Sequence, residues 1–140
     1  MRGTSEERFW AKVGPHTDSK VCWIWLAGFR QSRGLKYGVF GTYKGHGVYA
    51  HRFAYELLVG PIPKGMTIDH VKTRGCTNTL CVNPSHLEPV TRKENILRGM
   101  GVSALNARKT HCKRGHLFDE VNTYRYKSGR KCRACKRLGV

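Results

Sequence analysis

Cysteine and histidine residues occur in two groups whose spacing constrains the fold of this chain more than any other sequence feature. The groups are Cys76-x4-Cys81-x4-His86, and Cys112-x3-His116 followed by Cys132-x2-Cys135. The total of six cysteines is even and is therefore also compatible with three disulfides. The N-terminal sequence MRGTSEERFW lacks the apolar stretch of an export signal. We therefore expect a reducing compartment, in which such spacing indicates metal binding.

Structural zinc sites use four nitrogen or sulfur ligands in a closed tetrahedron. The second group supplies all four and is typical of a zinc ribbon or knuckle. The first group supplies three, and Cys22 is the one cysteine left to complete it. This assignment gives each site three cysteines and one histidine, although His46 or His51 could replace Cys22. Free buried cysteines are the alternative to metal. The sequence thus predicts two structural zinc ions.

The charge of the chain indicates the kind of partner it binds. Among 140 residues there are 26 Lys and Arg and 9 Asp and Glu, so the formal net charge is 26 − 9 = +17. Such an excess suits a phosphate backbone, which makes nucleic acid the first expectation and an anionic membrane surface the second. A basic protein without a polyanionic partner is the remaining alternative. No apolar run reaches the roughly 18 residues of a membrane span, and no basic amphipathic helix favours the membrane surface. We therefore expect a cytoplasmic protein without a membrane partner.

Capping residues and hydrophobic periodicity predict short helices and short strands. Thr4 and Glu7 form a capping box at the start of a helix over residues 4–13, and Thr91 and Glu94 form another at the start of a helix that runs to about Arg98. Only 39% of the residues are hydrophobic, which leaves a modest core for zinc to reinforce. We expect an α+β fold with domains at residues 1–99 and 100–140. The other predicted elements are strands at 21–25, 37–40 and 48–49 forming a ribbon, a helix at 50–59, strands at 66–70 and 87–90 around a loop, a helix at 91–98, a linker or loosely held helix at 99–110, and a basic Cys/His module at 111–137.

Zinc does not account for Asp69, His70 and Asn95, which the predicted strand, loop, strand and helix would place on neighbouring elements. The stretch from Ala50 to Gly99, AHRFAYELLVGPIPKGMTIDHVKTRGCTNTLCVNPSHLEPVTRKENILRG, resembles an HNH endonuclease of the phage-borne type. Its Cys-x4-Cys-x4-His clasp is similar to that of the His-Cys box homing endonucleases, and both groups belong to the ββα-metal superfamily. The resemblance implies a small zinc-stabilised ββα-metal nuclease core, with an N-terminal antiparallel β-ribbon and a C-terminal zinc-ribbon-like module.

The resemblance also implies roles for individual residues. His70 matches the general base that takes a proton from the attacking water, and Asn95 matches a ligand of the catalytic Mg²⁺ or Mn²⁺. Asp69 matches a second ligand of that ion in HNH enzymes. Neighbouring strand residues point to opposite faces, so Asp69 and His70 can share a site only where the strand loses its regularity. Arg52 resembles a phosphate-contacting arginine. His86 stands at the middle position, where HNH members usually carry Asn.

The function that the resemblance implies is hydrolysis of phosphodiester bonds in double-stranded DNA, by nicking or by cutting both strands. A homodimer making paired cuts is compatible with this, as is a biological role in homing, restriction or phage packaging. The location would be the interior of a bacterial host, with the protein encoded by the host or by a phage. The alternative is a non-catalytic, zinc-dependent DNA- or RNA-binding protein with the same scaffold.

Overall fold

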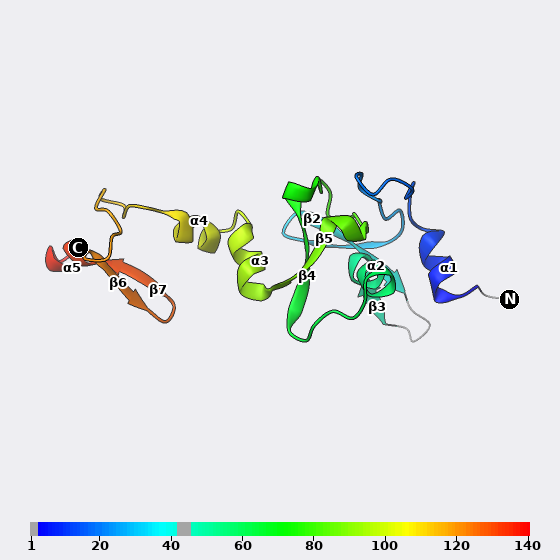
Figure 1. The fold of residues 1–140 in the computed structure, drawn as a ribbon. Coiled ribbons are helices and arrows are strands. Elements are labelled where there is room, and N and C mark those ends of the chain that lie inside the picture. The colour runs from blue at the N-terminus through cyan, green and yellow to red at the C-terminus, as the bar shows by residue number, and fades with distance from the viewer. Residues whose placement is uncertain (1–2, 42–45) are drawn as a thin grey trace. The chain divides into compact units, whose positions relative to one another are not determined.

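The computed structural model describes residues 3–41 and 46–140, which form two compact units (Figure 1). The N-terminal unit ends at Asn95 and the C-terminal unit is Ile96–Val140. The division falls within a helix, four residues before the boundary at residue 99 that the sequence predicts. Within the described ranges, no helix is both long enough and apolar enough to cross a membrane.

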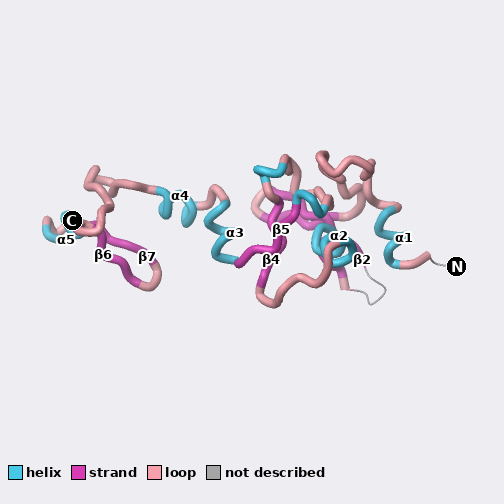
Figure 2. Tube along the Cα trace, viewed as in Figure 1, coloured by secondary structure: helices cyan, strands magenta, loops and turns pink. Residues whose placement is uncertain are grey.

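The N-terminal unit contains two antiparallel sheets and several short helices (Figure 2). Strands β1, β2 and β3 form one sheet in that order, and β4 pairs with β5 in the other. The elements are α1 (Ser5–Trp10), β1 (Phe29–Ser32), β2 (Leu35–Gly41), β3 (Gly47–Tyr49), α2 (Ala50–Leu58), β4 (Met66–His70), the 3-10 turns η1 (Lys72–Arg74) and η2 (Pro84–His86), β5 (Leu87–Thr91) and α3 (Arg92–Arg98), which continues into the second unit.

Capping boxes start two of these helices. The side chain of Thr4 accepts a hydrogen bond from the backbone N–H of Glu7, and the carboxylate of Glu7 accepts one from the backbone of Thr4. Thr91 and Glu94 make the same reciprocal pair at the start of α3. Each pair satisfies backbone donors that a helix start otherwise leaves open. The predicted starts of both helices are therefore confirmed.

The first strand of the sheet lies at Phe29–Ser32 and not at residues 21–25, so that part of the prediction is wrong. The backbone of residues 23–25 forms hydrogen bonds with two irregular segments, one near Gly14 and one at residues 80–82. Trp25 donates its backbone N–H to the carbonyl of Leu80, and Ile24 accepts one from Gly14. The apolar residues alternate because one side of this segment packs into the core. Its backbone, however, pairs with loops and not with a strand of the sheet. A two-residue turn with positive φ at Arg33 and Gly34 joins β1 to β2, as in type I′ hairpins.

The core of the N-terminal unit is aromatic. The ring of Phe9 lies 5.2 Å from Trp25 and 5.4 Å from Phe40 between centroids. Ala50 and Ala54 are fully buried on α2, and their small side chains let the helix approach these rings. This core fixes α2 and the 23–25 segment against the sheet. Helix α2 carries His51 and Arg52, and the 23–25 segment directly follows Cys22.

Strands β4 and β5 and helix α3 follow one another in the order expected of a ββα unit. The strands pair from Met66 with Thr91 to His70 with Leu87. The long connection between them, residues 71–86, carries η1, η2 and three of the clustered ligands. The fold is thus α+β, as predicted, with small antiparallel sheets and two Cys/His clusters that could hold zinc.

The C-terminal unit is built around a hairpin. Arg130 on the hairpin donates to the carbonyls of Asn106, at 2.8 Å, and Lys109, and its guanidinium lies 4.1 Å from the ring centroid of Phe118. These contacts join the hairpin to the helix and loop that precede it. The elements are α4 (Val102–Arg108), β6 (Thr123–Tyr126), β7 (Gly129–Cys132) and α5 (Arg133–Arg137). Residues 99–110, expected to be a linker or a loosely held helix, thus contain helix α4.

Candidate metal clusters and active site

The first cluster brings together Cys22, Cys76, Cys81 and His86, whose ligand atoms all lie within 4.8 Å of one another. Sγ of Cys22 lies 4.0 Å from Sγ of Cys76 and 3.7 Å from Nδ1 of His86. Zinc bonds of about 2.3 Å to sulfur and about 2.0 Å to nitrogen give tetrahedral edges of roughly 3.5–3.8 Å. The four atoms therefore fit one zinc ion. Neither His46 nor His51, the alternatives to Cys22, belongs to this group.

Asn83 explains how Cys22 reaches ligands that lie more than fifty residues later in the chain. Its buried side chain donates hydrogen bonds to the carbonyls of Ser19, at 2.8 Å, and Val21, at 2.7 Å. Its Oδ1 accepts the backbone N–H of Ser85 and caps η2, the turn that ends at His86. One side chain therefore joins the segment before Cys22 to the turn that presents the histidine.

Thiolate formation is favoured in this cluster. A hydrogen bond from the Cys81 thiol lowers the pKa of Cys76 to about 5, although burial acts in the opposite direction. The same hydrogen bond raises the pKa of Cys81, and burial adds to that shift. A thiolate is the form of cysteine that binds metal. The lowered pKa of Cys76 favours its thiolate, and a bound cation would draw the proton from the other thiols.

The second cluster lies in the C-terminal unit and contains Cys112, His116, Cys132 and Cys135. Nδ1 of His116 lies 3.5, 3.6 and 3.4 Å from the sulfur atoms of Cys112, Cys132 and Cys135. The sulfur atoms of Cys112 and Cys135 are 3.7 Å apart. These distances are the edges expected around zinc. Two of these ligands come from adjoining elements. Cys132 is the last residue of β7 and caps α5, and Cys135 lies on α5.

His70, the last residue of β4, is held by the loop that carries the first cluster. Its Nε2 lies 3.0 Å from the carbonyl oxygen of Cys81. A carbonyl oxygen only accepts, so Nε2 carries the hydrogen in this contact and Nδ1 of the neutral ring is left as an acceptor. The imidazole is therefore oriented with its basic nitrogen directed away from the clasp.

His51, predicted only as a substitute zinc ligand, packs against His70. The two rings are 4.8 Å apart between centroids, and Tyr37 lies 6.3 Å from His70. His51 is 7% exposed, and its Nδ1 is buried without a hydrogen-bond partner in the described chain. Burial first, and then the charges of His70 and Arg52, lower the pKa of His51 to about 3. The only sequence signal for His51 was its position in Ala50-His51-Arg52, at the start of the stretch that resembles HNH endonucleases.

Asn95 contacts the same strand as His70 but at another point. Its Nδ2 donates to Oγ1 of Thr67 at 3.2 Å, which leaves the amide oxygen Oδ1 available to a cation. Thr67 and Asp69 share a face of β4 because side chains alternate along a strand. Asp69 also raises the pKa of Tyr37, after burial and Tyr49, so its charge reaches the ring that neighbours His70. Thr67, which Asn95 contacts, and His70 are three residues apart on β4, and Asp69 lies between them in sequence. The strand pairs regularly through His70, so its alternation places Asp69 with Thr67 on one face and His70 on the other.

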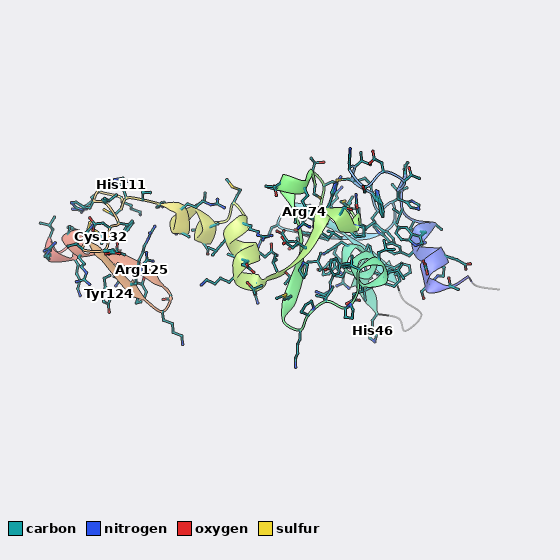
Figure 3. The ribbon with its side chains drawn as sticks, in the orientation of Figure 1. His46, Arg74, His111, Tyr124, Arg125 and Cys132 are labelled. Atoms are coloured by element: carbon teal, nitrogen blue, oxygen red, sulfur yellow. The ribbon has the colours of Figure 1, made fainter. Side chains whose placement is uncertain are left out.

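Two arginines border this region. Arg52 lies on α2, next to His51, and is partly exposed. Arg74, labelled in Figure 3, is the other and was not among the predicted site residues. It donates to the carbonyl of Leu87 at 3.3 Å and pairs with Glu88 at 3.6 Å. These contacts tie the connection 71–86 to β5 and hold it in place beside the end of β4.

Comparison with known proteins identifies the segment that contains these residues. Residues 48–97 match the family described as HNH endonuclease. The protein 2.8 of Escherichia phage T7 is 40% identical over 78 residues, which cover 55% of this chain and 48% of that protein. The uncharacterized gene 5.3 protein of Enterobacteria phage T3 is 38% identical over 48 residues, which cover 34% of this chain and 44% of that protein.

The chain spans about half the length of these curated relatives. No solved structure matches it significantly. The family match covers most of β3, all of α2, the β4–β5 hairpin and α3 except its last residue, and it includes Arg52, Asp69, His70 and Asn95. Residues 48–97 of this chain therefore form a segment that matches the HNH endonuclease family.

Proposed function

We propose that this chain is a metal-dependent endonuclease that hydrolyses phosphodiester bonds of double-stranded DNA, with His70 as the general base. One observation carries the proposal: the contact between Nε2 of His70 and the carbonyl of Cys81 fixes the tautomer and leaves Nδ1 as a proton acceptor. That arrangement lies in a segment of the HNH endonuclease family. A neutral imidazole with a free ring nitrogen is a common general base for proton transfer from water.

The other residues of the segment position the base and bind the substrate. His51 packs against the His70 ring and, together with the Cys81 carbonyl, limits its rotation. Oδ1 of Asn95 and the carboxylate of Asp69 are the hard oxygen ligands that would hold Mg²⁺ or Mn²⁺. When bound, such an ion supplies charge stabilisation at the scissile phosphate and the leaving oxygen. Arg52 contacts a phosphate.

Both Cys/His clusters hold structural zinc in this proposal. Each offers three sulfur atoms and one imidazole nitrogen at tetrahedral separations. The first cluster also serves the reaction indirectly, because Cys81 supplies both a ligand sulfur and the carbonyl that orients His70. The protein acts on DNA in the bacterial cytoplasm, where the thiols remain reduced.

A plasmid assay tests the catalytic role of His70. Supercoiled DNA is incubated with Mg²⁺ and either the unchanged chain, His70→Ala, or His46→Ala, which replaces an exposed histidine of the same unit. We expect His70→Ala to lower the cleavage rate at least about 100-fold, the usual contribution of a general base, and His46→Ala to keep it. The nicked and linear products also distinguish single-strand from double-strand cleavage.

Controls separate lost chemistry from lost structure. His70→Ala must retain two zinc ions and its affinity for duplex DNA, measured without added Mg²⁺. Cleavage by His70→Ala at the unchanged rate would refute the assignment of the base. Duplex binding by the unchanged chain with no cleavage in Mg²⁺ or Mn²⁺ would favour the non-catalytic, zinc-dependent binding protein. Sedimentation of the chain with and without DNA tests for a homodimer.

A further inference from the structure

The hairpin of the C-terminal unit exposes two aromatic rings that have no role in a core. Tyr124 and Tyr126 occupy alternate positions of β6 and therefore lie on one face of it. Their side chains are 47% and 43% exposed. The rings are 6.3 Å apart between centroids and nearly parallel, at 22°. Figure 3 shows Tyr124 and Arg125 on this hairpin. Exposed aromatic rings gathered on one face indicate a binding surface.

Positive charge surrounds these rings. Residues 123–137 contain seven Lys and Arg and no Asp or Glu. Nζ of Lys131 lies 5.7 Å from the ring centroid of Tyr126, and Nζ of Lys136 lies 5.7 Å from that of Tyr124. The hairpin therefore combines ring faces with cations at short range, which complements a ligand that carries both aromatic groups and negative charge.

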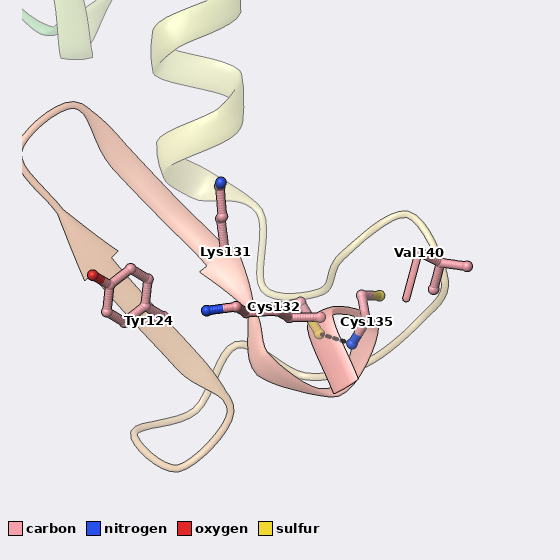
Figure 4. Close-up of a pocket in the computed structure, with 6 residues that line it drawn as sticks. Tyr124, Lys131, Cys132, Cys135 and Val140 are labelled. Atoms are coloured by element: carbon pink, nitrogen blue, oxygen red, sulfur yellow. Dashed lines mark hydrogen bonds between the residues drawn. The ribbon is translucent and has the colours of Figure 1, made fainter. Parts of the chain in front are cut away.

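Two shallow pockets lie beside Tyr124. The first has a volume of about 380 Å³ and is formed by the hairpin, α5 and the C-terminal residue (Figure 4). The second, about 410 Å³, adjoins it on the side of α5. No acidic residue lines either pocket, and Tyr124 and Lys136 line both. The lining residues are Tyr124, Lys131, Cys132, Cys135, Lys136 and Val140 in the first pocket and Tyr124, Arg133, Lys136 and Arg137 in the second.

We propose that the surface formed by Tyr124, Tyr126, Lys131 and Lys136 binds unpaired bases of single-stranded DNA, which depends on DNA being the substrate as proposed above but not on catalysis by His70. Surfaces that bind single strands combine aromatic rings, on which bases stack, with cations that follow the backbone. In a duplex the base faces are covered by their neighbours, so a duplex could use the lysines but not the exposed rings. The two tyrosines therefore favour an unpaired segment.

Binding of a labelled oligothymidine to the full chain tests this surface. Fluorescence anisotropy is measured without added Mg²⁺, so the readout does not depend on cleavage, and a duplex of equal length is measured in parallel. Stacking on one aromatic ring contributes about a tenfold change in affinity or more on alanine substitution. We expect Tyr124→Ala to weaken oligothymidine binding about tenfold, Tyr124→Phe to stay within about threefold, and duplex binding by both to remain unchanged.

Val121→Ala is the matched control, because Val121 is 80% exposed in the same unit and does not line either pocket. All variants are compared at equal zinc content. Equal affinities of Tyr124→Ala and Val121→Ala for oligothymidine would overturn the proposal, and so would an equal loss of duplex binding in Tyr124→Ala. A clear preference of the unchanged chain for oligouridine would instead make RNA the ligand and overturn the choice of DNA.

Photo-crosslinking gives a second, independent readout. An oligonucleotide carrying 5-iododeoxyuridine reacts on irradiation with aromatic side chains that stack on the base. We expect the crosslinked peptide to contain Tyr124 or Tyr126. A crosslink confined to the N-terminal unit would overturn the proposal. If the unchanged chain gives the expected crosslink but does not cleave plasmid, the single-strand surface is supported and the proposed nuclease function is refuted.

Discussion

Replacing Gly38 with alanine should destabilise the N-terminal unit because the added methyl group would clash with Trp25 and crowd Ala50. A Cβ at this position of β2 would lie 2.5 Å from Cδ1 and 2.7 Å from Cγ of Trp25, and 3.1 Å from Cβ of Ala50. Carbon atoms in contact are normally about 3.5–4.0 Å apart. Trp25 is 1% exposed, and its indole N–H donates to the carbonyl of Gly28 at 2.9 Å. The indole therefore cannot move away without losing packing or this hydrogen bond.

The expected cost follows from the overpacking of closed cores, which is about 1–3 kcal/mol. For a unit of this size, a loss of about 2 kcal/mol lowers the melting temperature by roughly 8–16 °C. The displacement would also reach the first metal cluster. The segment that carries Trp25 bonds to the backbone of Leu80 and Val82 on either side of Cys81, and it begins next to Cys22. Zinc should therefore dissociate faster from the first cluster than from the second.

Gly41→Ala is the control for this substitution. Gly41 belongs to the same strand, and a Cβ there would have no described atom within 4 Å. Chemical denaturation of the two zinc-loaded variants measures the difference in unfolding free energy, and a chromogenic chelator follows zinc release. Unfolding free energies of Gly38→Ala and Gly41→Ala that agree within about 0.5 kcal/mol would show that the core accommodates the methyl group and would refute the reasoning.

Three further predictions concern the clusters and the buried histidine. Cys76→Ser should reduce the zinc content from two ions to one per chain by atomic emission, with Cys132→Ser removing the other; two ions in either variant would contradict the ligand sets. Asn83→Ala should lower the unfolding free energy by about 2–3 kcal/mol in denaturant titration, because two backbone carbonyls lose their donor; Asn83→Asp, which keeps the capping oxygen but not the donor, should also destabilise. The pKa of His51 is about 3 when folded and near 6.5 when unfolded, so the unfolded chain binds the proton first as pH falls. The unfolding free energy should therefore decrease by about 2 kcal/mol from pH 7 to pH 5, and His51→Gln should remove that part of the decrease.

Residues close together in the chain were the ones whose arrangement could be predicted. Zinc-like spacing indicated the three ligands at residues 76–86 and the four at 112–135, and the structure brings each set together. Thr91 and Glu94 form a capping box within four residues and fixed the start of α3. These predictions succeed because hydrogen bonds and ligand geometry act over a few residues, where the backbone limits the possible separations.

The strand predicted at 21–25 was wrong because its backbone partners are distant in the chain. The apolar alternation of Trp23 and Trp25 reports which side of the segment is buried, but it carries no information about the backbone partner. The partners turned out to be loops, and the sheet begins at Phe29 instead. The contact of His51 with His70 was likewise missed, because it joins α2 to the end of β4 through packing.

The sequence by itself determined the α+β class, the local ligand spacing and the HNH-like segment, all of which depend on neighbouring residues. Only the tertiary structure decided which residue completes the first cluster, which group faces the candidate base and which strand opens the sheet. Cys22 reaches its place because Asn83 holds the carbonyls of Ser19 and Val21. Such contacts depend on the burial of an aromatic core that folds distant segments together, and no local pattern specifies that packing.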